Sequence, residues 1–226
     1  MTEELILALD GLEETRAFHL TRLLGQEAYC VKVHDLLDGS DQPTIIQRLK
    51  DNGAARVWVD YKLHDIPKTV GRRAKKLKKA GADIITVHAS GGKDMVVAAV
   101  ESEAEIFVIT VLTSLTPTEI EGIYGTSPEA AVQYLAGIAM AAGAAGFVCS
   151  PLEVASLRDL NQQFKRVVPG TRSVGVATGD QKRVATPLAT LTAGAHHLVI
   201  ASQVTEATDP VEAWKKLVAE ISAAQA

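Results

Sequence analysis

The chain has 226 residues, of which 47% are hydrophobic, and its formal net charge at pH 7 is −4. This length allows one sizeable hydrophobic core but is short for two domains. The negative charge gives no reason to expect binding to nucleic acid or to an anionic membrane surface. The N-terminus lacks a basic-then-apolar signal, and no apolar run approaches the roughly 18 residues of a membrane span. We therefore expect a cytoplasmic protein.

Short apolar runs rich in valine and isoleucine alternate with amphipathic stretches along the whole chain. The expected strands are 5–10, 30–34, 56–60, 84–88, 106–112, 146–149, 166–168 and 197–201. The expected helices are 12–25, 42–52, 67–80, 92–103, 128–142, 151–163, 183–193 and 210–224. Apolar strands that alternate with helices form a parallel sheet, and eight such units close into a barrel. We predict an α/β fold, a (β/α)8 TIM barrel, as a single domain over residues 1–226.

Polar residues gather where the predicted strands end. The active site of a (β/α)8 barrel lies at the carboxyl ends of its strands. The starts of the predicted strands carry far fewer polar residues. This difference predicts that the chemistry takes place at the carboxyl ends of the strands. The residues at these ends are Asp10, Lys32, His34, Asp60, Lys62, Asp65, His88, Ser90, Thr113, Ser114, Ser150, Gly170, Arg172, Ala201 and Ser202.

The segment 59–69 holds the densest group of charges, with Asp60, Lys62 and Asp65 close together after an apolar run. Side chains two apart share a face of a strand, so Asp60 and Lys62 are expected to point inward with Trp58. Asp65 is expected in the following loop, within reach of that pair. A lysine between two carboxylates is held protonated and aimed, as a proton donor must be. The alternative is an ordinary strand end with solvated charges.

Several other residues of the sequence could have a functional or a structural role. Lys32 lies inside an apolar strand and needs a partner or a role. Asp10 is either functional or a helix cap, and His34 either functional or a surface residue. No metal site is expected, because the histidines lack ligand spacing and a lysine among the acids works against a divalent cation. Cys30 and Cys149 lie in apolar runs, which favours buried thiols over a disulfide.

The segment 169–183, which follows the seventh predicted strand, is long for a connection in such a barrel. Its three glycines suit a mobile loop that covers a substrate. The loops after strands seven and eight are the usual phosphate site of the fold. A phosphorylated small molecule is therefore the expected substrate.

Over essentially its whole length the chain resembles the orotidine 5′-phosphate decarboxylase family, which acts last in pyrimidine nucleotide synthesis. The Asp-x-Lys-x-x-Asp-Ile-Pro motif within 60–70 is highly specific, since sugar-phosphate relatives share Asp-x-Lys-x-x-Asp without Ile-Pro. The remaining matches are Leu7-Ala8-Leu9-Asp10, Val31-Lys32-Val33, Val87-His88-Ala89-Ser90-Gly91-Gly92, Val111-Leu112-Thr113-Ser114, Val148-Cys149-Ser150, Pro169-Gly170-Thr171-Arg172 and Gly179-Asp180-Gln181.

The resemblance implies a decarboxylation of a small-molecule nucleotide without a cofactor. Lys62 would protonate the pyrimidine carbon that loses carbon dioxide, and Asp60 would lie beside the departing carboxylate. Lys32 and Asp65 would complete the charged array. A homodimer with shared active sites is implied, in which Asp65 and Thr69 come from the second chain. The implied substrate contacts are Asp10 and Lys32 to the ribose, Thr113 and Ser114 to the base, and Arg172 and Gln181 to the phosphate.

The chain departs from the family pattern at two positions. Where the family ends strand eight with Val-Ile-Gly-Arg-Pro-Ile-Thr, residues 199–205 read Val-Ile-Ala-Ser-Gln-Val-Thr, so Ser202 replaces the arginine that grips the phosphate. A charge-assisted hydrogen bond is worth about 1.5–3 kcal/mol. Ser202 and the Ala201 N–H would bind an oxyanion more weakly. His34 replaces a glycine near the barrel mouth.

Three functions follow from this pattern. The favoured one is an orotidine 5′-phosphate decarboxylase with weakened phosphate binding. The second is a decarboxylase or lyase of the same superfamily with another substrate, for which His34 and Ser202 would set the specificity. The third is a ligand-binding paralogue without catalysis. The intact charged residues argue against the third, because a costly buried charge cluster without function is improbable.

Overall fold

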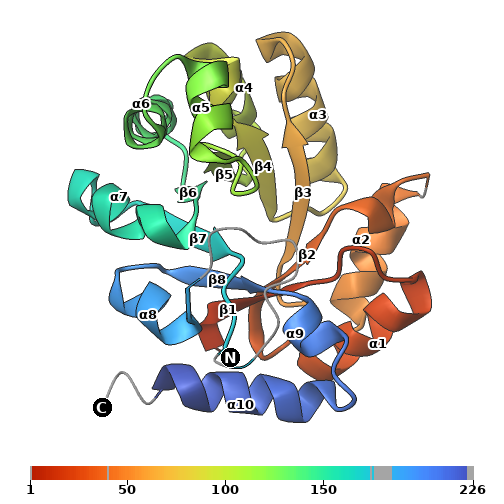
Figure 1. Cartoon of the computed structure of the whole chain (residues 1–226). Coiled ribbons are helices and arrows are strands. Elements are labelled where there is room, and N and C mark those ends of the chain that lie inside the picture. The colour runs from red at the N-terminus through yellow and green to blue at the C-terminus, as the bar shows by residue number, and fades with distance from the viewer. Residues whose placement is uncertain (1, 40, 174, 176–184, 223–226) are drawn as a thin grey trace.

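The computed structural model describes residues 2–39, 41–173, 175 and 185–222 (Figure 1). Eight parallel strands pair in chain order, and β8 pairs with β1 to close a barrel. The predicted (β/α)8 fold is thereby confirmed. The strands are β1 Thr2–Ala8, β2 Ala28–Val33, β3 Val57–Leu63, β4 Ile84–His88, β5 Glu105–Ile109, β6 Gly146–Val148, β7 Lys165–Pro169 and β8 His197–Ile200.

Helices surround the barrel, as Figure 1 shows, and α10 packs against α1, α8 and α9. No helix among the described residues is long and apolar enough to span a bilayer. The α-helices are α1 Glu14–Leu24, α2 Gln42–Asp51, α3 Pro67–Lys79, α4 Lys93–Val100, α5 Pro117–Tyr124, α6 Pro128–Ala141, α7 Val154–Leu160, α8 Pro187–Thr192, α9 Ser202–Thr205 and α10 Pro210–Ser222. Single 3-10 turns are η1 Asp35–Leu37, η2 Ala89–Gly91 and η3 Pro151–Glu153.

Two helices were absent from the predicted set, and several predicted boundaries are wrong, among them the end of the fifth strand, which is Ile109 rather than 112. Helix α5 begins with a proline at its first turn and a capping box between Thr116 and Glu119. Helix α9 has only four residues, too few for a periodic pattern. Helix α8 begins at Pro187 rather than at 183, because proline suits a first turn and Thr186 caps the Ala189 N–H.

Strand alternation divides the apolar side chains into two sets. One set lies between the strands and the helices, and it includes Leu5, Leu7, Val31, Val57 and Val59. The other set fills the barrel itself, with Ile6, Ala8, Cys30, Trp58, Ile84, Phe107, Val167 and Val199. The next residues along the inner rows of the first three strands are Asp10, Lys32 and Asp60. The hydrophobic filling of the barrel therefore gives way to charge at the carboxyl end.

The amino end of the barrel is also charged, so the prediction that the strand starts carry few polar groups was wrong. We call Tyr29, Arg56, Glu105, Lys165 and His197 the basal cluster. The Glu105 carboxylate pairs with Arg56 and, at 2.6 Å, with Lys165. Both cations donate to the Tyr29 hydroxyl, and the Tyr29 ring stacks on His197 with centroids 3.9 Å apart. These residues start different strands, so their proximity appears only when the barrel closes.

The prediction of buried thiols is confirmed by the structure. Cys30 and Cys149 are both buried thiols outside any disulfide. The basic side chains of α3 lie on its outer face, while Val70, Ala74 and Leu77 are buried. The lysine and arginine run of that helix is therefore a solvated face.

Candidate active site

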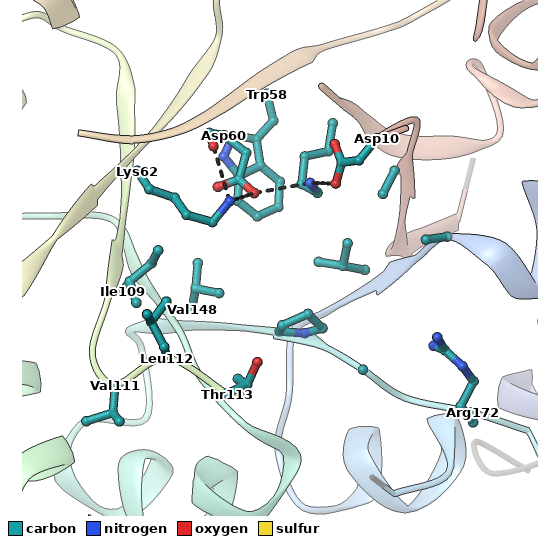
Figure 2. Close-up of a pocket in the computed structure, with 16 residues that line it drawn as sticks. Asp10, Trp58, Asp60, Lys62, Ile109, Val111, Leu112, Thr113, Val148 and Arg172 are labelled. Carbon is teal, nitrogen blue, oxygen red and sulfur yellow. Dashed lines mark hydrogen bonds and ion pairs between the residues drawn. The ribbon is translucent and has the colours of Figure 1, made fainter. Parts of the chain in front are cut away.

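The carboxyl ends of the strands surround a cavity of about 260 Å³. Residues from β1, β2, β3, β5, β6, β7 and β8 line it, together with segments that follow these strands. Figure 2 shows Asp10, Asp60 and Lys62 along one side, and Thr113 and Arg172 on the other. One side of the cavity is thus charged in both signs, and the Arg172 guanidinium lies across from it.

The charged side is a connected chain of four groups, Asp10, Lys32, Asp60 and Lys62, which we call the charged array. The Lys32 ammonium pairs with Asp10 and lies 3.1 Å from Oδ2 of Asp60. The Lys62 ammonium lies 2.8 Å from the same Asp60 oxygen (Figure 2). Lys32 and Asp60 are only 5% and 6% exposed, so their charges are matched by each other rather than by water.

The electrostatics of the array keep its buried members ionised. Burial alone would raise the pKa of Asp60, but the ammonium groups of Lys32 and Lys62 outweigh it and hold that pKa below its ordinary value. Burial would lower the pKa of Lys32, but the carboxylates of Asp60 and Asp10 raise it above its ordinary value. At neutral pH Asp60 is therefore an anion and Lys32 a cation.

Lys62 is held by an irregular piece of backbone. Its φ is 49°, in the left-handed region that side chains other than glycine seldom adopt. The pairing of β3 with β4 shifts register between Val59 and Leu63, which brackets this residue. Its ammonium nevertheless lines the cavity beside Asp60, as the alternation pattern predicted. Backbone strain of this kind is concentrated at functional sites, where surrounding contacts hold it.

Asp65 lies outside the cavity, so the prediction that it reaches Asp60 and Lys62 of its own chain was wrong. It is exposed, and its carboxylate accepts a 2.7 Å hydrogen bond from the Ile66 N–H. It borders a separate hollow with His64, Ile66 and Pro67, because the chain turns outward after β3 to begin α3. Lys32, rather than Lys62, is the lysine between two carboxylates.

Thr69 belongs to the first turn of α3, partly buried and away from the cavity lining. Thr113 does line the cavity, whereas Ser114 is exposed beside it. His34 follows the end of β2 and meets the Tyr61 ring edge-on, with centroids 5.9 Å apart. The imidazole therefore packs outside the lining rather than within it.

The far end of the cavity is formed where β7 and β8 end. Arg172 and Ala201 line it, and Nη2 of Arg172 lies 3.5 Å from the Ser202 hydroxyl. Gln203 joins the two segments, because its amide donates to the Ser173 hydroxyl at 2.6 Å and accepts from the Ser173 N–H at 3.2 Å. The predicted phosphate contact Gln181 lies outside the described residues.

Thr86 was missed by sequence reasoning. It is fully buried on β4 and accepts a 2.6 Å hydrogen bond from the Trp58 indole. Strand alternation was the available signal, because Thr86 lies two positions after Ile84, whose side chain fills the barrel. Among the residues that the structure describes, no three histidine, cysteine or acidic side chains gather as a metal site requires.

The chain was compared with known proteins. The model of the orotidine 5′-phosphate decarboxylase / HUMPS family matches residues 3–217. A protein named orotidine 5′-phosphate decarboxylase from Anaeromyxobacter dehalogenans is 39% identical, covering 96% of this chain and 98% of the relative. A protein of the same name from Prochlorococcus marinus is 37% identical, covering 97% and 96%. The crystal structure of orotidine 5′-phosphate decarboxylase from Lactobacillus acidophilus matches with a TM-score of 0.82 at 29% identity, covering 97% and 99%.

Proposed function

This chain belongs to the orotidine 5′-phosphate decarboxylase / HUMPS family, and from that premise we propose that it converts orotidine 5′-phosphate to uridine 5′-phosphate in pyrimidine nucleotide synthesis. It is a carboxy-lyase. The observation that carries the proposal is the charged array at the carboxyl end of the barrel, where a buried anion holds two ammonium groups at the wall of a small cavity. We place the enzyme in the cytoplasm.

Lys62 is the proton donor of this proposal. When the bond to the carboxylate carbon breaks, its electron pair stays on the ring carbon and carbon dioxide leaves. An ammonium fixed beside that carbon stabilises the developing carbanion and then transfers a proton to it. Asp60 supports the step because its carboxylate holds the Lys62 ammonium at 2.8 Å. No external electron acceptor is needed, which fits a reaction without a cofactor.

The substrate is oriented by groups on both sides of the cavity. Asp10 and Lys32 are the proposed ribose contacts, since they are adjacent to the reacting pair and already joined to each other. Thr113 and Ser114 are proposed to contact the base. The proposed phosphate contacts at the far end are Arg172, Gln181, Ala201 and Ser202.

A homodimer with shared active sites is also proposed. Asp65 and Thr69 lie outside the cavity of their own chain, and Ile66 between them is 65% exposed. A neighbouring copy that covered this apolar side chain would bring the Asp65 carboxylate toward a cavity other than its own. Each cavity would then hold three carboxylates and two lysines, with Asp65 beside the Lys62 ammonium.

A second candidate is a superfamily decarboxylase or lyase with another substrate, and Ser202 favours it. A hydroxyl replaces the guanidinium that would grip a phosphate, which leaves Arg172 as the described cation nearest to that end of the cavity. A ligand-binding paralogue without catalysis is disfavoured, because burying Lys32 and Asp60 costs stability. A protein that only binds a ligand would be more stable with apolar residues at these two positions.

The test is to mix purified protein with orotidine 5′-phosphate, follow the loss of its absorbance and identify the product by chromatography. We expect uridine 5′-phosphate from the wild type. The Ser202→Arg variant should raise kcat/KM roughly ten- to a hundredfold, because it restores one charge-assisted hydrogen bond to the phosphate. Turnover only in Ser202→Arg would favour the second candidate. Absence of turnover in both proteins would reject the decarboxylase assignment.

A further inference from the structure

The turn that carries Asp10 is held by a side chain that follows the neighbouring strand β2. The Leu9 N–H donates to the Lys32 carbonyl at 3.0 Å. Two residues further on, the Gly11 N–H donates to both carboxylate oxygens of Asp35, at 2.9 and 3.1 Å. Asp35 is the first residue of η1, just beyond the end of β2. The amides before and after Asp10 are therefore both bound to β2 or to the turn that follows it.

The Asp35 carboxylate takes the place of a main-chain acceptor. In a parallel ladder, alternate N–H groups of one strand donate to alternate carbonyls of its neighbour, so the Gly11 N–H would next meet the His34 carbonyl. That carbonyl instead accepts from the Leu37 N–H at 3.2 Å, because the chain leaves the sheet at His34 to form η1. The side chain of Asp35 thus supplies the acceptor that the backbone no longer offers.

Gly11 is the flexible point of this turn. Its φ is 71°, in the left-handed region that favours glycine. A Cβ added there would meet nothing within 4 Å, so glycine is required by the backbone conformation rather than by lack of space. A glycine adopts several backbone conformations at little cost unless a contact selects one of them. The hydrogen bond to Asp35 is such a contact.

We propose that Asp35 is a positioning residue of the active site, which fixes the turn at Gly11 and so keeps the Asp10 carboxylate on the Lys32 ammonium. This inference deepens the proposed decarboxylation and rests on it, since Asp10 is a proposed ribose contact. The Asp10 side chain is 42% exposed and lines the cavity, so water competes with Lys32 for its carboxylate (Figure 2). Fixing the backbone of the turn favours the lysine in that competition.

Loss of this restraint should disturb the ribose end of the site more than the reacting end. Lys32 keeps its second partner, because its ammonium lies 3.1 Å from Oδ2 of Asp60. The Lys62 ammonium stays on the same oxygen at 2.8 Å. The proton donor therefore remains in place without Asp35. The effect of Asp35 is expected in substrate binding rather than in proton transfer.

Two other roles for Asp35 lead to different expectations. In a purely structural role, the hydrogen bond only closes a connection between strands. Its loss would then reduce the folded fraction, which lowers the apparent kcat and leaves KM unchanged. In a purely electrostatic role, Asp35 would act through its negative charge near the cavity. Removing the charge would then have the same effect whether or not an acceptor remained at that position.

The experiment compares Asp35→Ala, Asp35→Asn and Asp38→Ala in the full chain. Asp35→Ala removes the acceptor, and KM for orotidine 5′-phosphate should rise roughly three- to tenfold with kcat within about twofold, because the bond is charge-assisted but exposed to solvent. Asp35→Asn removes the charge and keeps an oxygen acceptor, so it should recover most of the loss. Asp38→Ala removes another exposed acid from the same connection and, as the matched control, should keep the wild-type KM.

A double-mutant cycle tests whether Asp35 acts through Asp10. In an Asp10→Ala background, Asp35→Ala should raise KM by less than about twofold, because the side chain that it positions is already absent. Equal increases in both backgrounds would overturn the proposal. A lower kcat at unchanged KM, or equal effects of Asp35→Ala and Asp35→Asn, would overturn it as well.

The carboxyl carbon of Asp10 gives a readout that needs no substrate. Its NMR resonance, assigned with Asp10→Asn, should move in Asp35→Ala and stay close to its wild-type position in Asp35→Asn and Asp38→Ala. If the wild type does not turn over orotidine 5′-phosphate, the proposed function fails, while this resonance still decides whether Asp35 positions Asp10. An unchanged resonance in Asp35→Ala would overturn the proposal.

Discussion

Asp60 is the residue on which the active site depends, because one of its oxygens holds both the Lys32 and the Lys62 ammonium groups. The two lysines are not equivalent. Lys32 is buried and paired with two carboxylates, so its positive charge contributes a constant electrostatic potential inside the cavity. Lys62 is more exposed, with 38% of its side-chain surface accessible, so it is the one that can meet a substrate. The division fits a buried charge behind a more accessible proton donor.

Removing the fixed charge is the first prediction. Lys32→Met keeps the length of the side chain but removes the cation paired with Asp10 and leaves Asp60 with only the Lys62 ammonium. We expect kcat/KM for orotidine 5′-phosphate to fall by roughly a hundredfold or more, because breaking a buried ion pair leaves an uncompensated charge. Steady-state kinetics measure the loss. Lys165→Met, which removes a carboxylate-paired lysine from the other end of the barrel, is the matched control and should keep near wild-type turnover.

Individual site residues differ in how well the sequence predicted them. Alternation along the apolar strand was enough to predict that Asp60 points inward with Trp58, whereas Asp10 and Lys32 were indicated only by their places in or at the end of apolar strands. Asp65 was misplaced because nothing in the pattern shows that the chain turns outward after Leu63. The left-handed backbone of Lys62 could not be predicted from the sequence either, since it depends on a register shift between two strands rather than on local residue preferences.

At the scale of elements, the start of the β7–α8 connection and helix α9 behave as one unit. Two hydrogen bonds between Ser173 and Gln203 join them, and Arg172 precedes that tether directly. Nη2 of Arg172 is thereby held near Ser202 at the far end of the cavity. The position of the one described guanidinium in the cavity lining therefore depends on a side-chain amide in a neighbouring element.

Removing the hydrogen bonds between Ser173 and Gln203 should weaken the binding of the substrate phosphate and change little else. Gln203→Ala removes both hydrogen bonds, and we expect kcat/KM for orotidine 5′-phosphate to fall about two- to tenfold, the worth of one neutral hydrogen bond. Activity toward orotidine, which lacks the phosphate, should not change. The ratio of the two constants is the measurement. Gln42→Ala, which removes an amide bonded to Tyr61 instead, should leave that ratio unaltered. An equal loss toward both substrates would contradict the role of the tether.

Strands and long helices were predictable, and short helices were not. The strands showed as apolar runs even where they are as short as β6, the longer helices have enough residues for a period to show, and the order of these elements determined the fold class. Helix α9, with four residues, offers no period at all. Helix α5 was missed although Thr116, Pro117 and Glu119 form a start signal that could have been recognised. The Ser173 to Gln203 contact joins segments 30 residues apart and follows only from barrel closure.

At the scale of the whole molecule, the basal cluster closes the end of the barrel opposite the active site. His197 is its histidine. Nδ1 of His197 lies 2.6 Å from the Glu3 carbonyl, which can only accept, so the neutral ring carries its proton there. Nε2 is buried without a partner in the described structure. Burial, opposed by the Glu3 carbonyl, lowers the pKa of His197 to about 4.

Acid should therefore destabilise the fold before the carboxylates are neutralised. The unfolded chain binds a proton at His197 near its ordinary pKa of 6.5, while the folded chain resists until about 4, so stability is lost as the pH falls through this window. The loss from this residue is about 3 kcal/mol. Urea unfolding at several pH values measures it. His197→Gln should reduce the slope between pH 6.5 and 4, and the remainder should include His88, whose pKa burial also lowers to about 4.

The proposed dimer gives a prediction that a single chain cannot satisfy. Lys62→Ala and Asp65→Asn should each be inactive, because every active site needs one residue from each copy. Mixing the two variants and allowing subunit exchange should restore about a quarter of wild-type activity, since half of the randomly formed dimers carry one intact site of two. Activity no greater than the sum of the separate variants would show that Asp65 serves its own chain or none.

The most direct test of the whole account is the turnover of orotidine 5′-phosphate by the wild type and by Lys62→Ala, each shown by circular dichroism to be folded. We predict formation of uridine 5′-phosphate by the wild type and a loss of at least about a thousandfold in Lys62→Ala, because the variant lacks both the proton donor and the ammonium that stabilises the carbanion. Equal turnover by the two proteins would contradict the assigned role of Lys62, and absence of turnover by the wild type would contradict the assigned reaction.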